Sequence, residues 1–228
     1  MVELDRIKTG IPGLDDLVDG GFPKGNLIVV SGDPGSGKTI LCMEYLYYGA
    51  EKYDEPGVYV SLEESKEGVI KLASLFGWDF EELIKKKKLD IVAVDLYDFE
   101  QLKDIIEDSV SRIKAKRIVI DPGVIFRLYF KNELDARKQL LGLGKMLKKT
   151  NCTAVVTNEL LDKESTLFGL EEYVADGVVL LFHKKVNEHF LRSIAVLKMR
   201  GTKISEKVFP VSLSKKGIII LSKQEVFD

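Results

Sequence analysis

Eight consecutive residues near the start of the chain match G-x-x-x-x-G-K-[ST], the pattern of a phosphate-binding loop. They are Gly32, Asp33, Pro34, Gly35, Ser36, Gly37, Lys38 and Thr39, and Ile40 follows directly. Glycines let such a loop turn its N–H groups inward, where they attract phosphate oxygens together with the N-terminus of the next helix. The pattern predicts that this segment binds ATP or ADP, that Lys38 reaches the β- and γ-phosphates, and that the Thr39 hydroxyl holds Mg²⁺.

The sequence on either side of the loop has the strand-turn-helix order that this motif requires. Residues 26–31 are mostly apolar and β-branched, which predicts a buried strand. Residues 40–50 carry Glu44 as their only charge and predict a mostly buried helix. A glycine-rich turn that ends in Lys-Thr by coincidence is the alternative, and both flanks argue against it.

Acidic residues stand at the ends of two further predicted strands. Asp121 follows the apolar residues 118–120 and closes the predicted strand 117–121, and doubly wound sheets bind ligands at the carboxyl ends of their strands. We expect Asp121 to hold Mg²⁺ directly or through water, the alternative being an aspartate that only terminates a strand. Glu63 and Glu64 follow a predicted strand, where one carboxylate would face the nucleotide and polarise the attacking water. A solvated acidic turn is the alternative for this pair.

The elements that would position these residues alternate between strand and helix along the first two thirds of the chain. After the loop, predicted strands at 58–62, 89–94, 117–121 and 153–157 alternate with helical patterns. Ser65 and Asp98 have the pattern of helix caps. From residue 178 onward, four short strands follow without helices between them. We therefore expect an α/β fold in which a mostly parallel twisted sheet has helices on both faces and continues into a C-terminal antiparallel meander.

Composition sets the class of protein. Of 228 residues, 45% are apolar and 31% are charged, which indicates a soluble globular chain that we expect to form a single domain over residues 1–228. A net charge of −2 argues against nonspecific nucleic-acid binding over the whole surface. Cys42 and Cys152 lie in apolar runs and are expected to be core thiols. The sequence shows neither a signal peptide nor a run near the ~20 apolar residues of a membrane helix, so we expect a cytoplasmic protein without a membrane partner.

Three segments resemble the RecA-like ATPases of the KaiC and RadA type. Thr-Gly-Ile-Pro-Gly-Leu-Asp at 9–15 and Gly-Gly-Phe-Pro-Lys-Gly at 20–25 precede the phosphate-binding loop in the order found in that family. The later segment 198–202, Lys-Met-Arg-Gly-Thr, is similar to the Lys-x-Arg-Gly-Thr/Ser signature of KaiC. The resemblance spans about residues 9–221. It implies one KaiC-like domain with a RecA-like P-loop NTPase core, of the single-domain archaeal kind.

The resemblance implies roles for five further residues. In the KaiC family an adjacent Glu pair is implicated in hydrolysis, which implies that role for Glu63 first and Glu64 second. RecA-like proteins place a γ-phosphate sensor at the end of the fifth strand, here Asn158. The Lys and Arg of the KaiC signature reach the γ-phosphate of a neighbouring subunit in a ring. This implies catalytic roles for Lys198 and Arg200, which two apart on a strand would share a face. From residue types alone, they are two cations on a solvated edge strand.

The sequence departs from the family in three places. Pro122 follows Asp121 where the family usually has a small polar residue. Glu172-Tyr173 falls where the second KaiC domain has its phosphorylated Ser-Thr pair, so the chain looks more like the hydrolytic first domain. Residues 203–207 lack the His and Gly of KaiC.

We expect Mg²⁺-dependent ATP binding and slow ATP hydrolysis by a homo-oligomer, for which a hexameric ring is one arrangement. Two rival functions stay open. A RadA-paralogue-type ATPase of recombination and repair would bind DNA through the cations that follow Asp121, although ordinary helix-surface charges are the favoured explanation of these residues. They are Arg127, Lys131, Arg137 and Lys138. The second rival is a signalling scaffold whose nucleotide state controls a partner.

Overall fold

The computed structural model describes residues 4–94, 99–122, 132–160 and 174–224. Several residues discussed above lie outside these ranges: Asp98, Arg127, Lys131, Glu172 and Tyr173. None of the helices within the described ranges has the length and apolar character of a bilayer span.

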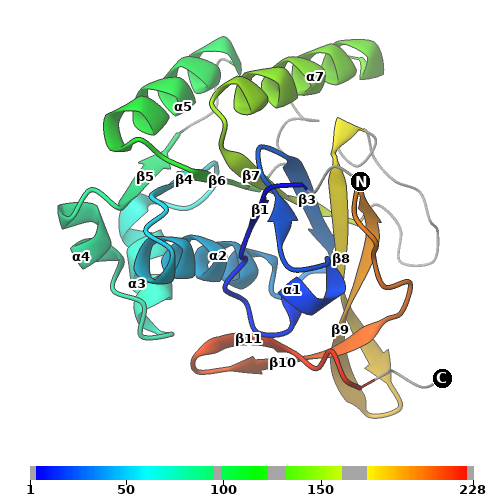
Figure 1. Ribbon diagram of the computed structural model, residues 1–228. Coiled ribbons are helices and arrows are strands. Elements are labelled where there is room, and N and C mark those ends of the chain that lie inside the picture. Colours follow the sequence, from blue (N-terminus) through cyan, green and yellow to red (C-terminus); the bar gives the residue numbers. More distant parts are fainter. Residues whose placement is uncertain (1–3, 95–98, 123–131, 161–173, 225–228) are drawn as a thin grey trace.

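A nine-stranded sheet runs through the centre of the molecule in the order β11-β10-β9-β8-β3-β7-β6-β4-β5 (Figure 1). Strands β3 to β8 pair in parallel, and β9, β10 and β11 add antiparallel strands at one edge. The strands are β3 (Leu27–Gly32), β4 (Gly57–Ser61), β5 (Leu89–Ala93), β6 (Arg117–Asp121), β7 (Thr153–Glu159), β8 (Gly177–Val186), β9 (His189–Met199), β10 (Phe209–Ser214) and β11 (Gly217–Ile220).

This architecture confirms the α/β fold that the sequence predicts, with one difference in the meander. The run that begins at Val178 is β8, and it pairs in parallel with β3 before it turns back into β9. The antiparallel part of the sheet therefore starts one strand later than the sequence pattern suggests. A separate two-stranded pair, β1 (Arg6–Ile7) with β2 (Phe22–Pro23), and a short helix α1 (Leu14–Leu17) lie at the N-terminal end.

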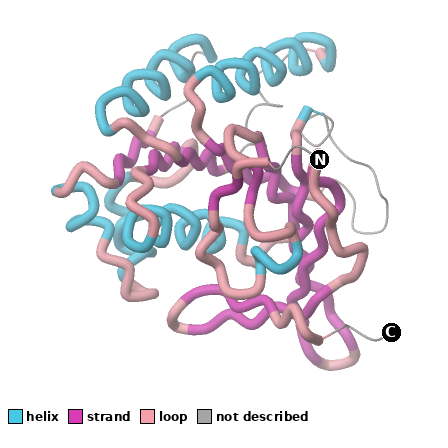
Figure 2. The backbone as a smooth tube through the Cα atoms, viewed as in Figure 1, coloured by secondary structure: helices cyan, strands magenta, loops and turns pink. Residues whose placement is uncertain are grey.

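Helices cover both faces of the sheet (Figure 2). One face carries α2 (Lys38–Lys52), α3 (Lys66–Ser74) and α4 (Phe80–Lys85), and the other carries α5 (Phe99–Ile113) and α7 (Glu133–Lys149). Successive residues of β3 divide between the two cores, because side chains of a strand point alternately to opposite faces. Ile28 and Val30 pack with α2, while Leu27 and Val29 pack toward α5 and α7.

The helix boundaries follow local signals in the sequence. Ser65 caps α3, since its hydroxyl accepts the N–H of Gly68 at 3.1 Å, as the sequence predicts. Gly77 lies beyond the end of α3 with a φ of 76°, a left-handed conformation that suits glycine. Asn132 caps α7 in the same way by accepting the N–H of Asp135.

A buried arginine braces the helix that follows the phosphate-binding loop. Arg117, at the start of β6, is fully buried. Its guanidinium donates to the carbonyls of Lys8 and Tyr45, both at 2.7 Å, and pairs with Glu55. Because Tyr45 lies on α2, this one side chain ties the N-terminal segment, helix α2 and strand β6 together.

A second buried charge joins α2 to the C-terminal hairpin. The carboxylate of Glu44 accepts the N–H of Ile218 on β11 at 2.7 Å. A Cβ at Gly217 would lie only 2.4 Å from the same oxygen, so β11 closes directly over this glutamate. Burial raises the pKa of Glu44 to about 7, although the Ile218 hydrogen bond and Lys52 oppose the shift.

The raised pKa predicts a pH-dependent stability that is specific to Glu44. The folded protein holds this proton more tightly than the unfolded chain, so stability falls as the pH rises from about 4.5 to about 7. In chemical denaturation between about pH 5 and pH 8, the Glu44→Gln variant should gain up to about 3 kcal/mol relative to wild type. Glu51→Gln, an exposed glutamate change on the same helix, should follow the wild-type profile. Parallel profiles for wild type and Glu44→Gln would contradict this account.

Candidate functional site

The predicted phosphate-binding loop joins the end of β3 to the start of α2. Gly35 and Gly37 have φ angles of 72° and 106°, which only glycine adopts without strain. At Gly32 a Cβ would lie 2.4 Å from the carbonyl oxygen of Leu181, so a larger residue cannot stand where the loop begins. The hydroxyl of Ser36 is buried and has no hydrogen-bond partner among the described residues. The loop thus combines the required backbone turns with an unused polar atom.

The Lys38 ammonium group bends back over the loop. It donates to the carbonyl oxygens of Gly32 at 2.8 Å and of Asp33 at 3.1 Å. Burial lowers the pKa of Lys38, while the carboxylates of Glu159, Asp121 and Asp33 act in the opposite direction. A partly desolvated cation at the mouth of an N–H-lined loop is suited to bind phosphate oxygens.

The Asp121 carboxylate is fixed by hydrogen bonds from both neighbouring strands. Tyr59 on β4 donates its hydroxyl to Oδ2 at 2.7 Å, and Thr157 on β7 donates its hydroxyl to Oδ1. The Asp121-Pro122 peptide bond is cis. Within the described ranges no group of three or more His, Cys, Asp or Glu side chains could hold a metal by itself. The donors here, one carboxylate and the Thr39 hydroxyl, instead fit Mg²⁺, which keeps waters and takes phosphate oxygens as ligands.

A cavity of about 270 Å³ separates Thr39 from α3, and Glu64 contributes to its wall. Tyr59 lines the same cavity and so connects it to Asp121. Glu63, which the resemblance ranks first for the role in hydrolysis, is not among the lining residues. The strand ends at Ser61, whose hydroxyl accepts the N–H of Glu64 at 3.0 Å and donates to its carbonyl at 2.7 Å. This turn breaks the strand alternation and brings Glu64, the second choice, to the cavity.

The end of β7 places two polar residues beside β3. Asn158 is fully buried and stands opposite Ser31, one residue before the loop. Its neighbour Glu159 stands opposite Gly32 and is among the carboxylates that act on the pKa of Lys38. The motif-based reasoning misses Glu159, although its position directly after Asn158 on the same strand is a usable signal.

The hairpin of β8 and β9 supports the outer side of the loop. No pattern in the sequence predicts this contact. The Asp33 carboxylate accepts the N–H of His183 at 2.8 Å. Arg192, paired across the hairpin with His183, donates Nε–H to the carbonyl of Gly35 at 3.0 Å. These contacts join residues about 150 positions apart and hold the loop against the antiparallel part of the sheet.

Lys198 and Arg200 lie level with the amino-terminal ends of the parallel strands, whereas the phosphate-binding loop lies at their carboxyl ends. Strand β8 pairs Gly177 with Ile28, and β9 in turn pairs Met199 with Gly177. Both cations therefore lie beside the start of β3. The loop begins at the other end of this strand, about 13 Å away along the residues from Ile28 to Gly32. This placement separates them from the loop of their own subunit.

The expectation that these two cations share one strand face is wrong. Strand β9 ends at Met199, so Arg200 lies in the turn that follows it. Lys198 is half-buried and donates to the carbonyl of Ala175 at 2.6 Å, whereas Arg200 is exposed and donates to the carboxylate of Asp176 at 3.0 Å. Burial and the charge of Arg200 lower the pKa of Lys198, and Asp176 opposes this shift.

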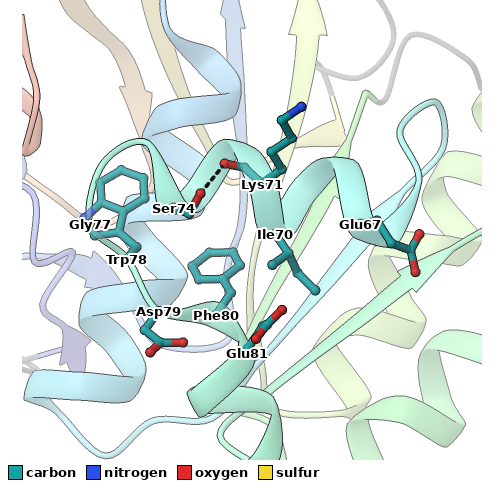
Figure 3. Close-up of a pocket in the computed structure, with 9 residues that line it drawn as sticks. All are labelled: Glu67, Ile70, Lys71, Ser74, Gly77, Trp78, Asp79, Phe80 and Glu81. Atoms are coloured by element: carbon teal, nitrogen blue, oxygen red, sulfur yellow. Dashed lines mark hydrogen bonds between the residues drawn. The ribbon is translucent and has the colours of Figure 1, made fainter.

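A larger cavity, of about 610 Å³, lies between α3 and α4 (Figure 3). Ile70, Trp78 and Phe80 give it an apolar wall, and Glu67 and Asp79 add carboxylates. No residue of the phosphate-binding loop lines this cavity. It is therefore distinct from the site built around Lys38 and Asp121.

The chain is similar to known proteins over nearly its whole length. A family model described as "ATPase: KaiC" matches residues 7–225. A UPF0273 protein of Methanocaldococcus jannaschii is 33% identical over 235 residues, covering 95% of this chain and 96% of that protein. The crystal structure of a KaiC-like protein from the hyperthermophilic archaeon Pyrococcus horikoshii superposes with a TM-score of 0.88 at 37% identity, covering 96% of this chain and 99% of that one.

Circadian clock proteins are also similar. The circadian clock oscillator protein KaiC of Prochlorococcus marinus is 33% identical over 233 residues. The alignment covers 97% of this chain but 46% of that protein, so the chain spans less than half the length of this relative.

The geometry of the loop predicts that binding of magnesium ATP depends on Lys38. Lys38→Ala removes the partly buried cation over the loop, and we expect affinity measured by calorimetry to fall at least thirtyfold, or roughly 2 kcal/mol. Lys52→Ala removes a lysine from the other end of the same helix and should leave affinity unchanged. Equal affinities for wild type and Lys38→Ala would refute a phosphate site at this loop.

Proposed function

The chain belongs to the KaiC family of ATPases, and we propose that it binds ATP with Mg²⁺ and hydrolyses it slowly as a single KaiC-like domain. The observation that carries the proposal is the position of Lys38. Its ammonium group lies over a loop whose turns require glycine, close enough to Asp121 for that carboxylate to act on the pKa of Lys38. The arrangement suits phosphoryl transfer, which depends on clamping the phosphates and neutralising their charge.

Each part of this site has a distinct role in the proposal. The loop N–H groups and Lys38 bind the β- and γ-phosphates, and Asn158 lies at the strand end where a γ-phosphate sensor is expected. Thr39 and Asp121 would hold Mg²⁺, directly or through water, and the bound ion would neutralise phosphate charge. The hydrogen bonds from Tyr59 and Thr157 keep the Asp121 carboxylate oriented for this task.

Glu64 is the residue we assign to activation of water. It lines the cavity next to Thr39, and as a carboxylate it can accept a proton from the attacking water. Glu63 precedes it in the same turn but stands outside that lining.

The two glutamates provide a matched pair of variants. Glu64→Gln should lower the turnover number at least about a hundredfold, because the amide cannot take the proton, while ATP affinity stays close to wild type. Glu63→Gln should retain most of the wild-type turnover. The reverse ranking in a steady-state phosphate-release assay would assign the role to Glu63.

The position of Lys198 and Arg200 supports completion of the site by a neighbouring subunit. Within one subunit they are held at the strand ends opposite the loop. They can therefore contact a nucleotide only when it is bound to another copy of the chain. Such a head-to-tail contact closes into a ring when the rotation between subunits permits it. A homo-oligomeric ring, with six subunits as the arrangement implied by the resemblance, is therefore part of the proposal.

Arg200→Ala tests this intersubunit role. The planar guanidinium would stabilise charge on the phosphate oxygens during hydrolysis, so its loss should lower the turnover number about a hundredfold while ATP affinity changes little. Arg112→Ala, which removes an arginine from the surface of α5, is the control and should keep wild-type turnover. Unchanged turnover in Arg200→Ala would remove this part of the proposal.

DNA binding remains the second candidate function because one described cavity is lined by cations. It has a volume of about 270 Å³ and lies along α7. Its charged lining residues are Arg137, Lys145, Lys148 and Arg200. DNA-stimulated hydrolysis with a steep dependence on salt would favour this function.

A further inference from the structure

We propose that Asp176 is a positioning residue that fixes Arg200 for its action on the nucleotide of the neighbouring subunit. The inference rests on the proposed function, since it has meaning only if Arg200 acts across the subunit interface. It concerns a carboxylate that no catalytic motif of this chain contains.

Asp176 joins Arg200 to the first residue of the phosphate-loop strand. Its carboxylate accepts the N–H of Leu27 at 3.1 Å and a guanidinium N–H of Arg200 at 3.0 Å. Its backbone repeats both links, because its N–H donates to the Leu27 carbonyl at 2.8 Å and its carbonyl accepts the N–H of Arg200 at 2.9 Å. Two hydrogen bonds on each side thus connect Arg200 to the strand that ends at the subunit's own phosphate-binding loop.

The Asp176 carboxylate is itself held in place. It is 5% exposed, and the ammonium group of Lys148 on α7 donates to it at 2.9 Å. Burial alone would raise the pKa of Asp176, but hydrogen bonds from Lys148 and Leu27 and the charges of Lys148 and Arg200 lower it overall. The group therefore stays ionised, and it keeps two donors even when Arg200 turns toward another partner.

Arg200 remains available to a ligand despite this anchor. Its side chain is 58% exposed, and one of its terminal nitrogens takes the bond to Asp176. An unrestrained arginine side chain loses rotamer freedom when it becomes ordered on a phosphate. A guanidinium that is already held on one side loses less of this freedom, which is the general advantage of a preorganised site.

A double-mutant cycle separates positioning from a general structural effect. Asp176→Asn retains an oxygen for the Leu27 N–H but loses the charge that holds Arg200. We expect it to lower the turnover number about tenfold with little change in ATP affinity. In an Arg200→Ala background the same change should have no further effect. Asp90→Asn, which removes the carboxylate that pairs with Arg112 on another part of the sheet, is the control and should leave turnover unchanged.

The alternative outcomes of the cycle are distinguishable. Wild-type turnover in Asp176→Asn, or an equal loss with and without Arg200, would overturn the inference. Wild-type turnover in Arg200→Ala would instead remove the intersubunit function on which it rests.

Lys148→Met, which leaves Asp176 itself intact, is the second variant if Asp176→Asn does not fold. A loss of turnover that disappears in the Arg200→Ala background supports the inference here too, and any other result opposes it.

Mixed assemblies test whether Asp176 acts for its neighbour. When equal amounts of Asp176→Asn and Glu64→Gln chains exchange at random, roughly a quarter of the sites combine an intact Glu64 with a neighbour's intact Asp176. Phosphate release should then exceed the mean of the two separate preparations by about fivefold, given the tenfold defect expected above. A gain for Arg200→Ala mixed with Glu64→Gln but none for Asp176→Asn would overturn the inference, and no gain for either mixture would remove the intersubunit function.

Discussion

The phosphate-binding loop depends on the lack of any side chain at the point where it leaves β3. At Gly32 the neighbouring strand comes so close that a Cβ would overlap the Leu181 carbonyl. The two glycines with positive φ then turn the chain into α2, and Lys38 folds back over the opening. Everything else in the site is arranged around this fixed backbone. Asp121 comes from the end of β6 and Glu64 from the turn after β4, and the β8–β9 hairpin supports the loop from outside.

Parallel pairing explains why the two halves of the proposed site lie far apart in one subunit. Because β3, β7, β6 and β4 all point the same way, their carboxyl ends collect the loop, Asp121 and Glu64 at one edge. Strand β9 runs in the opposite direction, so the residues at its carboxyl end lie beside the amino-terminal ends of the parallel strands. The reversal of strand direction between β8 and β9 thus separates Arg200 from Lys38.

Local signals in the sequence were sufficient for much of this picture. The loop, the strand that ends at Asp121 and the cap at Ser65 depend on residues within a few positions of each other, and the structure contains each of them. What could not be predicted depends on contacts between distant segments. Arg192 reaches the loop through strand pairing, and Arg117 is buried in a strand start because four carbonyl and carboxylate partners from other segments surround it. Glu63, which the resemblance ranks before Glu64, stands outside the cavity lining because the turn held by the Ser61 hydroxyl ends the strand alternation early.

The separation of Lys38 and Arg200 has a consequence for the isolated chain. A single subunit contains every group proposed to hold the triphosphate and lacks, at that position, the cations proposed to promote its cleavage. Dissociated chains would then hold nucleotide and hydrolyse it only very slowly, and turnover would rise on assembly. Such an arrangement would make the rate of ATP hydrolysis per subunit depend on the concentration of the protein itself, without a separate inhibitor.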